Sequence, residues 1–348
     1  MKAYQQSQLN TISTTKIKAV VLFSGGLDST LAAKVIINQG LEVVALNFRS
    51  PFCRCDRLSG CGSSIRNMAE QLGIEFKSVY LGQEYLRIVK APEYGYGKNL
   101  NPCIDCRIFK FRKAKEYMKE IGASFVITGE VLGQRPMSQH RRALEVIERE
   151  AGLIGLILRP LSAKLFSPTI AEQNNWVDRE SLLSLSGRTR KPQIKLAIEF
   201  SLKNYPCPAG GCLLTDPAFT QRLRDLMEHE DFNIVNVELL KIGRHFRINS
   251  SFKLVVGRDE KENAKLKNFL QKGDLYFEPT KLPGPSGLGR GEYDSKIKDI
   301  AAGIIARYTS KEEKVEISIL DVSSRRKDNV FLEAIGEVIS KELMINSK

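Results

Sequence analysis

The chain has 348 residues, of which 42% are hydrophobic and 27% are charged. This length suggests two domains, and the composition is that of a globular chain, not a disordered or fibrous one. No stretch approaches the ~18–20 uninterrupted apolar residues that a membrane span needs. The polar segment 1–15 lacks the apolar core of a secretory signal. We therefore expect a cytoplasmic protein that begins with a flexible segment.

Basic residues outnumber acidic ones by 53 to 40, which gives a formal net charge of +13. The excess is +10 over residues 1–230 and only +3 over residues 231–348. A basic excess indicates a polyanionic partner, most often nucleic acid, although many basic proteins bind none.

The seven cysteines fall into three short groups. They are Cys53, Cys55 and Cys61, then Cys103 and Cys106, then Cys207 and Cys212. An odd number of cysteines in a cytoplasmic chain argues against a disulfide framework. The grouping favours metal binding or thiol chemistry.

From residue 16 onwards, predicted strands and helices alternate. An apolar run at 18–23 predicts a buried strand, and a helix over 28–38 follows two glycines. Further strands are expected at 41–48, 76–81 and 124–128, further helices at 63–72 and 106–121, and a loop between 82 and 102. Repeated strand–helix units predict an α/β domain with a doubly wound parallel sheet over residues 16–225.

The pattern changes after residue 225. A hairpin is expected at 245–256, a helix at 260–271, a strand at 275–277, a Pro/Gly-rich loop at 282–291 and a helix at 295–308. These elements predict a second, smaller α+β domain over residues 226–348.

The sequence Ser24-Gly25-Gly26-Leu27-Asp28-Ser29 joins the first predicted strand to the first predicted helix. Glycines allow a tight turn that exposes backbone N–H groups, and a helix N-terminus adds positive potential, so the loop suits a phosphate. Asp28 beside an anion indicates Mg²⁺ binding. An ordinary turn between a strand and a helix is the alternative.

This loop resembles the SGGxDS motif of the PP-loop ATP pyrophosphatase superfamily, whose members cleave ATP to AMP and pyrophosphate. The resemblance implies that the loop contacts the phosphates and the metal, and that adenine binds near the end of the second strand. The residues concerned are Ser24, Gly25, Gly26, Asp28 and Ser29 for the phosphates, and Asn47 and Phe48 for adenine.

Two further blocks resemble tRNA thiolation enzymes. Asn101-Pro102-Cys103-x-x-Cys106 is similar to the NPCxxC motif of bacterial tRNA 2-thiouridylases. The segment 128–134 (TGEVLGQ), with Ser138-Gln139 and then 159–161 (RPL), is similar to tRNA 4-thiouridine synthases. The second resemblance places Gly129 and Gln134 in the nucleotide site and favours 4-thiouridine as the product over 2-thiouridine.

The CxxC and a distant cysteine can supply three ligands to a [4Fe–4S] cluster with one open iron. The ligands would be Cys103, Cys106 and one of Cys207 and Cys212. Alternatively, Cys103 carries a persulfide and Cys212 or Cys207 resolves it. Because a helix N-terminus stabilises a thiolate, the CxxC suits either chemistry. Four inert, buried cysteines are the third interpretation.

The remaining motifs indicate a second thiol site and contacts with RNA. Cys53, Cys55 and Cys61 form either another metal site or a sulfur relay. Basic residues surround the motifs, and each group has a solvated surface as its alternative. They are Arg107, Lys110, Arg112, Lys113, Lys115 and Lys119, then Arg135, His140, Arg141 and Arg142, then residues 187–195. Residues 241–247 and 253–259 resemble the C-terminal RNA-binding domain of NFACT-type proteins.

These patterns together predict an ATP-dependent tRNA sulfurtransferase that uses ATP, Mg²⁺ and a [4Fe–4S] cluster. Its catalytic residues would be Cys103, Cys212 and Asp28. Its partners would be tRNA and a sulfur donor, either a cysteine desulfurase or free sulfide, with no membrane. The oligomeric state stays open, with a homodimer as one form. Two other classes remain: a PP-loop enzyme that amidates or ligates a small molecule, and a non-catalytic Fe–S protein that binds RNA.

Overall fold

The computed structural model describes residues 16–54, 61–202, 205, 212–310 and 314–345, so the segment predicted to be flexible lies outside them. The chain divides into two compact units. The first unit comprises Met1–Leu81 with Pro102–Gly210, and the second comprises Gly82–Asn101 with Gly211–Lys348. The domain boundary expected after residue 225 stays a prediction. Within the described ranges, no helix is both long and apolar enough to span a bilayer.

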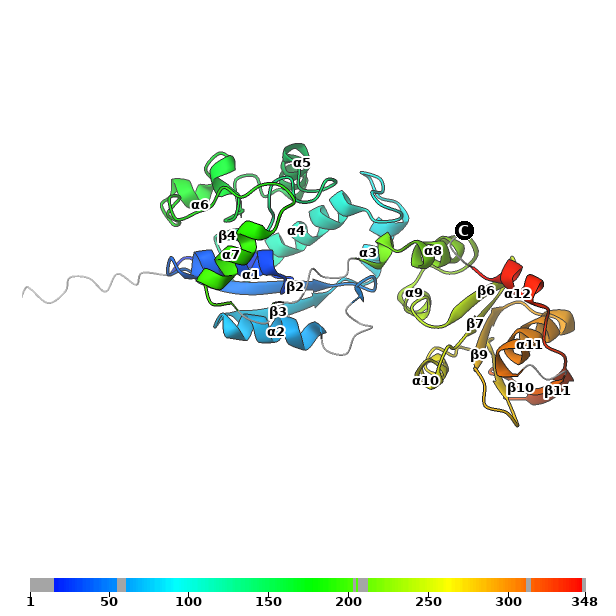
Figure 1. Ribbon diagram of the computed structural model, residues 1–348. Coiled ribbons are helices and arrows are strands. Elements are labelled where there is room, and N and C mark those ends of the chain that lie inside the picture. The colour runs from blue at the N-terminus through cyan, green and yellow to red at the C-terminus, as the bar shows by residue number, and fades with distance from the viewer. Residues whose placement is uncertain (1–15, 55–60, 203–204, 206–211, 311–313, 346–348) are drawn as a thin grey trace, which may run out of the picture. The chain divides into compact units, whose positions relative to one another are not determined.

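The first unit is built on a parallel five-stranded sheet in the order β3-β2-β1-β4-β5 (Figure 1). Its strands are β1 (Lys18–Leu22), β2 (Glu42–Arg49), β3 (Glu75–Tyr80), β4 (Phe125–Thr128) and β5 (Ile157–Leu158). The central strands are continuous apolar runs, as expected of strands buried on both faces. The predicted doubly wound α/β class is confirmed.

Helices cover both faces of this sheet. They are α1 (Leu27–Ile37), α2 (Cys61–Gln71), α4 (Cys103–Glu120), α5 (Arg141–Ala151), η2 (Ala163–Leu165), α6 (Ile170–Gln173) and α7 (Lys191–Glu199). Helices α1, α2 and α7 share one core cluster with Ala19 and Val21, and Figure 1 shows α2 and α4 on opposite sides of the sheet. Because the strand order reverses between β1 and β4, their carboxyl ends form the switch point where ligands bind in such sheets.

The second unit contains an antiparallel six-stranded sheet in the order β11-β10-β8-β9-β7-β6. Its strands are β6 (Arg244–Asn249), β7 (Phe252–Val256), β8 (Leu275–Pro279), β9 (Gly287–Gly291), β10 (Val315–Asp321) and β11 (Lys327–Leu332). Its helices are α3 (Gln83–Lys90), η3 (Leu213–Thr215), α8 (Pro217–His229), α9 (Ile234–Leu239), α10 (Glu260–Lys267), α11 (Ser295–Thr309) and α12 (Glu337–Leu343). Helix α11 packs against the sheet and shares its main core.

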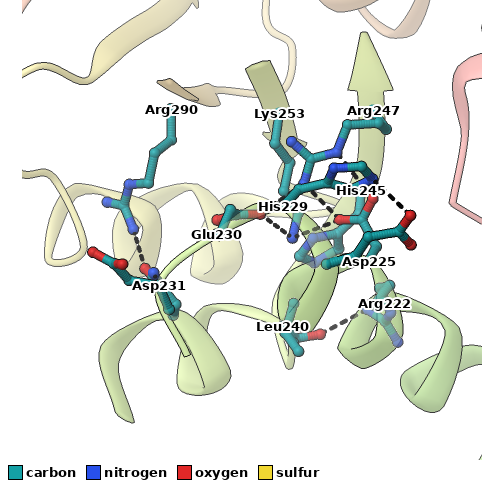
Figure 2. Close-up of polar contacts among 12 residues, drawn as sticks. Arg222, Asp225, His229, Glu230, Asp231, Leu240, His245, Arg247, Lys253 and Arg290 are labelled. Carbon is teal, nitrogen blue, oxygen red and sulfur yellow. Dashed lines mark hydrogen bonds and ion pairs between the residues drawn. The ribbon is translucent and has the colours of Figure 1, made fainter. Parts of the chain in front are cut away.

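A buried network of charged groups ties α8 to the β6–β7 hairpin within the second unit. Arg247 donates from Nε and Nη2 to the two carboxylate oxygens of Asp225, at 2.9 and 2.7 Å. Lys253 is 3% exposed, and its ammonium lies 3.0 Å from Glu230 and 3.4 Å from Asp225. Figure 2 shows these side chains converging. Opposite charges compensate one another here, which buried charges require.

Two predictions about loops are wrong. Residues 287–291 form strand β9, not a loop, because a Cβ at Gly289 would lie 2.5 Å from the Phe252 ring. The glycines there make room for core aromatics instead of making a turn. The segment after β3 contains α3, which buries Tyr85, Leu86 and Val89 at helical spacing.

Candidate active site

The phosphate loop lies between β1 and α1, as predicted. Gly25 has φ of +71°, and a Cβ on it would lie 2.9 Å from Ile65 Cγ1, so this position requires glycine. Gly26 is the N-cap of α1 and provides no side-chain cap. The first N–H groups of α1 are therefore available to a ligand.

Both serine hydroxyls of the loop lie at this helix start. Ser29 Oγ donates to the Gly26 carbonyl oxygen at 2.9 Å, and it lies 3.1 Å from Ser24 Oγ. The Gly26 N–H points to Ser24 Oγ at 3.4 Å. The loop is thus folded on itself with its donors grouped, which is the arrangement that a phosphate group needs.

Asp28 is held by residues 128–134 (TGEVLGQ), the LGQ segment, which begins at the end of β4. Gln134 Nε2 donates to Asp28 Oδ2 at 3.2 Å. The second carboxylate oxygen, Oδ1, is buried and has no partner among the described residues. An unpaired, buried carboxylate oxygen beside a phosphate cradle is the hard ligand that Mg²⁺ prefers, so the site fits this metal.

The end of β4 packs directly on the phosphate loop. A Cβ on Gly129 would come within 2.5 Å of the Asp28 carbonyl carbon and of the Ser29 nitrogen. Only glycine allows this approach. It brings the T-G-E-V-L-G-Q block against the first turn of α1.

Glu130, the next residue, has a structural role that was not among the sequence-based predictions. It is 2% exposed and pairs with Arg107 of α4 and, at 3.0 Å, with Arg159 after β5. Arg159 also pairs with Glu148 of α5. This chain of ion pairs links the start of α4 to the β4–β5 edge. The sequence signal that could have predicted this ion pair is the acidic residue within TGEVLGQ together with the arginine of the R-P-L block.

The CxxC thiols lie at the start of α4, where Pro102 is the N-cap. Cys103 and Cys106 are both half-buried and free. Burial raises the pKa of Cys103 and the neighbouring Cys106 raises it further, while Arg107 and Arg135 lower it. The backbone N–H at the start of α4 also lowers the pKa of Cys103, as expected of a helix N-terminus, but burial outweighs it, so that a thiolate at Cys103 stays a prediction.

Arg135 connects the thiols with the phosphate loop. Its guanidinium interacts electrostatically with both Cys103 and Asp28. Helix α4 precedes β4 in a parallel sheet, so its N-terminus belongs to the same edge as the phosphate loop. The structure thus brings the CxxC, the phosphate loop and the LGQ segment together.

Asn47 and Phe48 lie inside β2, which extends to Arg49. The Asn47 side chain donates to the Phe23 carbonyl oxygen at 2.8 Å and so fastens β2 to the end of β1. A role for these residues in binding adenine stays a prediction that concerns their backbone.

The other predicted thiol ligands lie in the second unit, in the segment after β2 or outside the described residues. Cys212 precedes η3 in the second unit and is not part of a disulfide. Cys53 Sγ accepts from the Ser50 N–H at 3.3 Å. Cys55, Cys207 and the Cys61 side chain lie outside the described residues. In the described ranges no three metal-ligating side chains converge, so the cluster ligands stay a prediction.

Several basic residues predicted to contact RNA are engaged within the protein. Arg107 pairs with Glu130, and Arg112 Nε donates to the Glu150 carbonyl oxygen at 3.0 Å. Lys119 is exposed in the last turn of α4. Their contacts with RNA remain predictions.

The fold and the loop define the first unit as a PP-loop nucleotide-binding domain. Residues 14–164 match the family model "Thiamine biosynthesis protein (ThiI)", and residues 243–339 match "NFACT protein RNA binding domain". The chain therefore carries a ThiI-type PP-loop domain and an NFACT-type domain, and the predicted resemblances are confirmed.

Known proteins agree with this assignment. The tRNA-specific 2-thiouridylase MnmA of Bordetella pertussis is 27% identical over 248 residues, which cover 67% of this chain and 63% of that protein. The chain thus spans less than two thirds of this relative's length. It is related to enzymes that modify tRNA by thiolation.

Two solved structures are also similar. One is a crystal structure of a 4-thiouridine synthetase–RNA complex with bound ATP, at 22% identity and a TM-score of 0.36 over 64% of this chain and 52% of that one. The other is the U34-tRNA thiolase NcsA from Methanococcus maripaludis with its [4Fe–4S] cluster. It has 18% identity and a TM-score of 0.33 over 65% of this chain and 73% of that one.

Proposed function

We propose that this protein is an ATP-dependent tRNA sulfurtransferase, which adenylates a uridine carbonyl oxygen and replaces that oxygen with sulfur. The observation that carries the proposal is the shared edge of the first unit, where Arg135 interacts with both Asp28 of the phosphate loop and Cys103 of the CxxC. A nucleotide site alone fits any PP-loop enzyme. A nucleotide site beside paired thiols supports sulfur transfer.

In the first step the phosphate loop holds ATP. The N–H groups of the first turn of α1 and the hydroxyls of Ser24 and Ser29 bind the phosphates, and Asp28 Oδ1 holds Mg²⁺. The uridine oxygen attacks the α-phosphorus, and pyrophosphate leaves. The base has to leave its stack to reach this edge.

In the second step a sulfur nucleophile attacks the activated carbon, and the C–O bond breaks with release of AMP. In the persulfide route the terminal sulfur on Cys103 is transferred, Cys212 or Cys207 completes the cleavage of the S–S bond, and a thiol reductant then reopens the resulting disulfide. In the cluster route, Cys103 and Cys106 with Cys212 or Cys207 would hold a [4Fe–4S] cluster that supplies an open iron for sulfide.

The second unit supports RNA as the substrate class, because its residues 243–339 match an RNA-binding domain. The sulfur donor would be a cysteine desulfurase or free sulfide. The resemblance of residues 128–134 to 4-thiouridine synthases favours 4-thiouridine as the product, whereas the CxxC and the 2-thiouridylase relative are compatible with 2-thiouridine.

Mass spectrometry of tRNA nucleosides from a deletion strain tests the function. We expect one thiouridine to disappear and to return when the wild-type gene is supplied, because the proposed enzyme introduces the sulfur of that nucleoside. An unchanged thionucleoside profile would contradict the proposal. Purified protein with ATP, Mg²⁺, tRNA and sulfide should release AMP only when tRNA is present, whereas a small-molecule ligase would turn ATP over without it.

A further inference from the structure

The segment 186–193 (SGRTRKPQ) runs beside the LGQ block although about 50 residues separate them in sequence. Ser186 forms an isolated parallel bridge with Leu132, and the Gly187 N–H donates to the Leu132 carbonyl oxygen at 2.7 Å. The two chain segments are therefore joined by backbone hydrogen bonds next to the switch point.

Two contacts link the segment before α7 with the first turn of α1. Leu132 lies two residues before Gln134, whose side chain binds Asp28 in the first turn of α1. Helix α7 begins at Lys191 and packs along α1 in the same core cluster. Helix α7 thus follows directly on a segment that is paired with the residues next to Gln134, and the N-terminus of a helix contributes positive potential.

Buried polar atoms of two side chains at the start of α7 have no hydrogen-bond partner among the described residues. Gln193 is 1% exposed, and neither its Oε1 nor its Nε2 has a hydrogen-bond partner among the described residues. The Nε atom of Arg190, the N-cap residue, is also buried and unpaired within the described ranges. Buried polar groups are almost always hydrogen-bonded, so two side chains with unpaired buried atoms within four residues point to a ligand.

We propose that Arg190 and Gln193 bind the pyrophosphate portion of ATP and so complete the phosphate cradle from a second helix. This inference rests on the use of ATP in the proposed function. A guanidinium and an amide N–H₂ donate to phosphate oxygens, and a charged donor makes the stronger bond. A ligand in this position satisfies polar atoms that have no partner in the described part of the chain.

The test measures binding of ATP, pyrophosphate and AMP to the full-length protein by calorimetry. We expect Arg190→Gln and Gln193→Leu each to weaken ATP and pyrophosphate about tenfold or more while AMP binds as in the wild type, because AMP lacks the pyrophosphate group. Lys195→Gln, which removes the same charge one turn later at an exposed position, should change none of the three. Gln193→Leu should also raise the melting temperature of the free protein, since it removes an unsatisfied amide.

Wild-type affinity for ATP and pyrophosphate in both variants would overturn the inference. So would an equal weakening of AMP binding, which indicates local damage, or weaker tRNA binding with ATP binding intact, which assigns the two residues to RNA phosphates. A wild-type protein that binds ATP and pyrophosphate through these residues but never thiolates tRNA would contradict the proposed function alone.

Discussion

At the scale of single residues, Cys103 and Asp28 belong to one edge of the sheet but are assigned to different steps of the proposed reaction. Cys103 carries the sulfur chemistry in both proposed routes, and its side chain is not part of the phosphate cradle. Asp28 is part of the phosphate loop and accepts a hydrogen bond from Gln134, and the proposed reaction forms no covalent bond to it. Substitutions can therefore separate ATP use from sulfur transfer.

Cys103→Ser should abolish thiouridine formation while AMP release in the presence of tRNA continues, because serine cannot carry sulfur and the phosphate loop is unchanged. The measurement is thionucleoside yield against AMP released by the purified protein. Cys106→Ser is the matched variant one turn along α4. It should keep activity in the persulfide route and lose it in the cluster route. Full thiolation by Cys103→Ser would exclude both routes.

Asp28→Asn should lower kcat/KM for ATP by about 100-fold, because a metal that stabilises charge on the phosphates contributes several kcal/mol. The asparagine oxygen can still accept from Gln134, so the loop should keep its shape. Raising the Mg²⁺ concentration should restore part of the rate. Glu145→Gln, at an exposed position of α5, is the control for removal of one carboxylate. Equal kinetics for the two variants would remove Asp28 from the metal site.

At the scale of elements, the sequence predicted those strands, helices and turns that depend on the residues of one short segment alone. The buried strands and the phosphate loop were predictable because a continuous apolar run followed by glycines and a helix has few alternatives. Strand β9 was not predictable, because the sequence G-L-G-R-G is typical of a loop. Only the structure shows that aromatic rings occupy the space beside its glycines. The pairing of Ser186 with Leu132 was equally hidden, since it depends on how distant segments fold together.

The second unit contains a histidine that should make its stability depend on pH. His245 is 1% exposed, its Nε2–H donates to the Ile242 carbonyl oxygen at 2.8 Å, and its Nδ1 has no partner in the described ranges. Burial, with the charges of Lys253 and Arg222, holds the pKa of His245 well below its usual 6.5. The folded state therefore keeps this imidazole neutral.

The unfolded chain takes up a proton near pH 6.5, whereas the folded chain does so only at a lower pH. The free energy of unfolding should therefore fall as the pH drops below 6.5. Melting temperatures between pH 7.5 and about 5 should show this slope in the wild type and a flatter one in His245→Gln, which cannot titrate. His229→Gln, at the end of α8, should keep the wild-type slope. Identical slopes in all three proteins would show that His245 does not cause the dependence.

At the scale of the whole molecule, the charge is divided unequally between the two parts of the chain. Residues 1–230 carry +10 and residues 231–348 only +3. In the second unit many basic groups are already paired, as Arg247, Lys253 and Arg290 are with acidic partners. We therefore expect the electrostatic share of RNA binding to come from the first unit, and the second unit to bind through local interactions.

The dependence of tRNA affinity on salt tests this division. Each lysine or arginine on an RNA phosphate adds to the slope of log K against log salt, because binding releases counterions. The double variant Arg112→Gln, Lys119→Gln on α4 should reduce this slope by about 1 for each RNA phosphate that it no longer neutralises. The control pair Lys261→Gln, Lys272→Gln, exposed in the second unit, removes the same charge and should leave the slope unchanged. If the control pair flattens the slope and the α4 pair does not, the phosphate-binding side chains belong to the second unit.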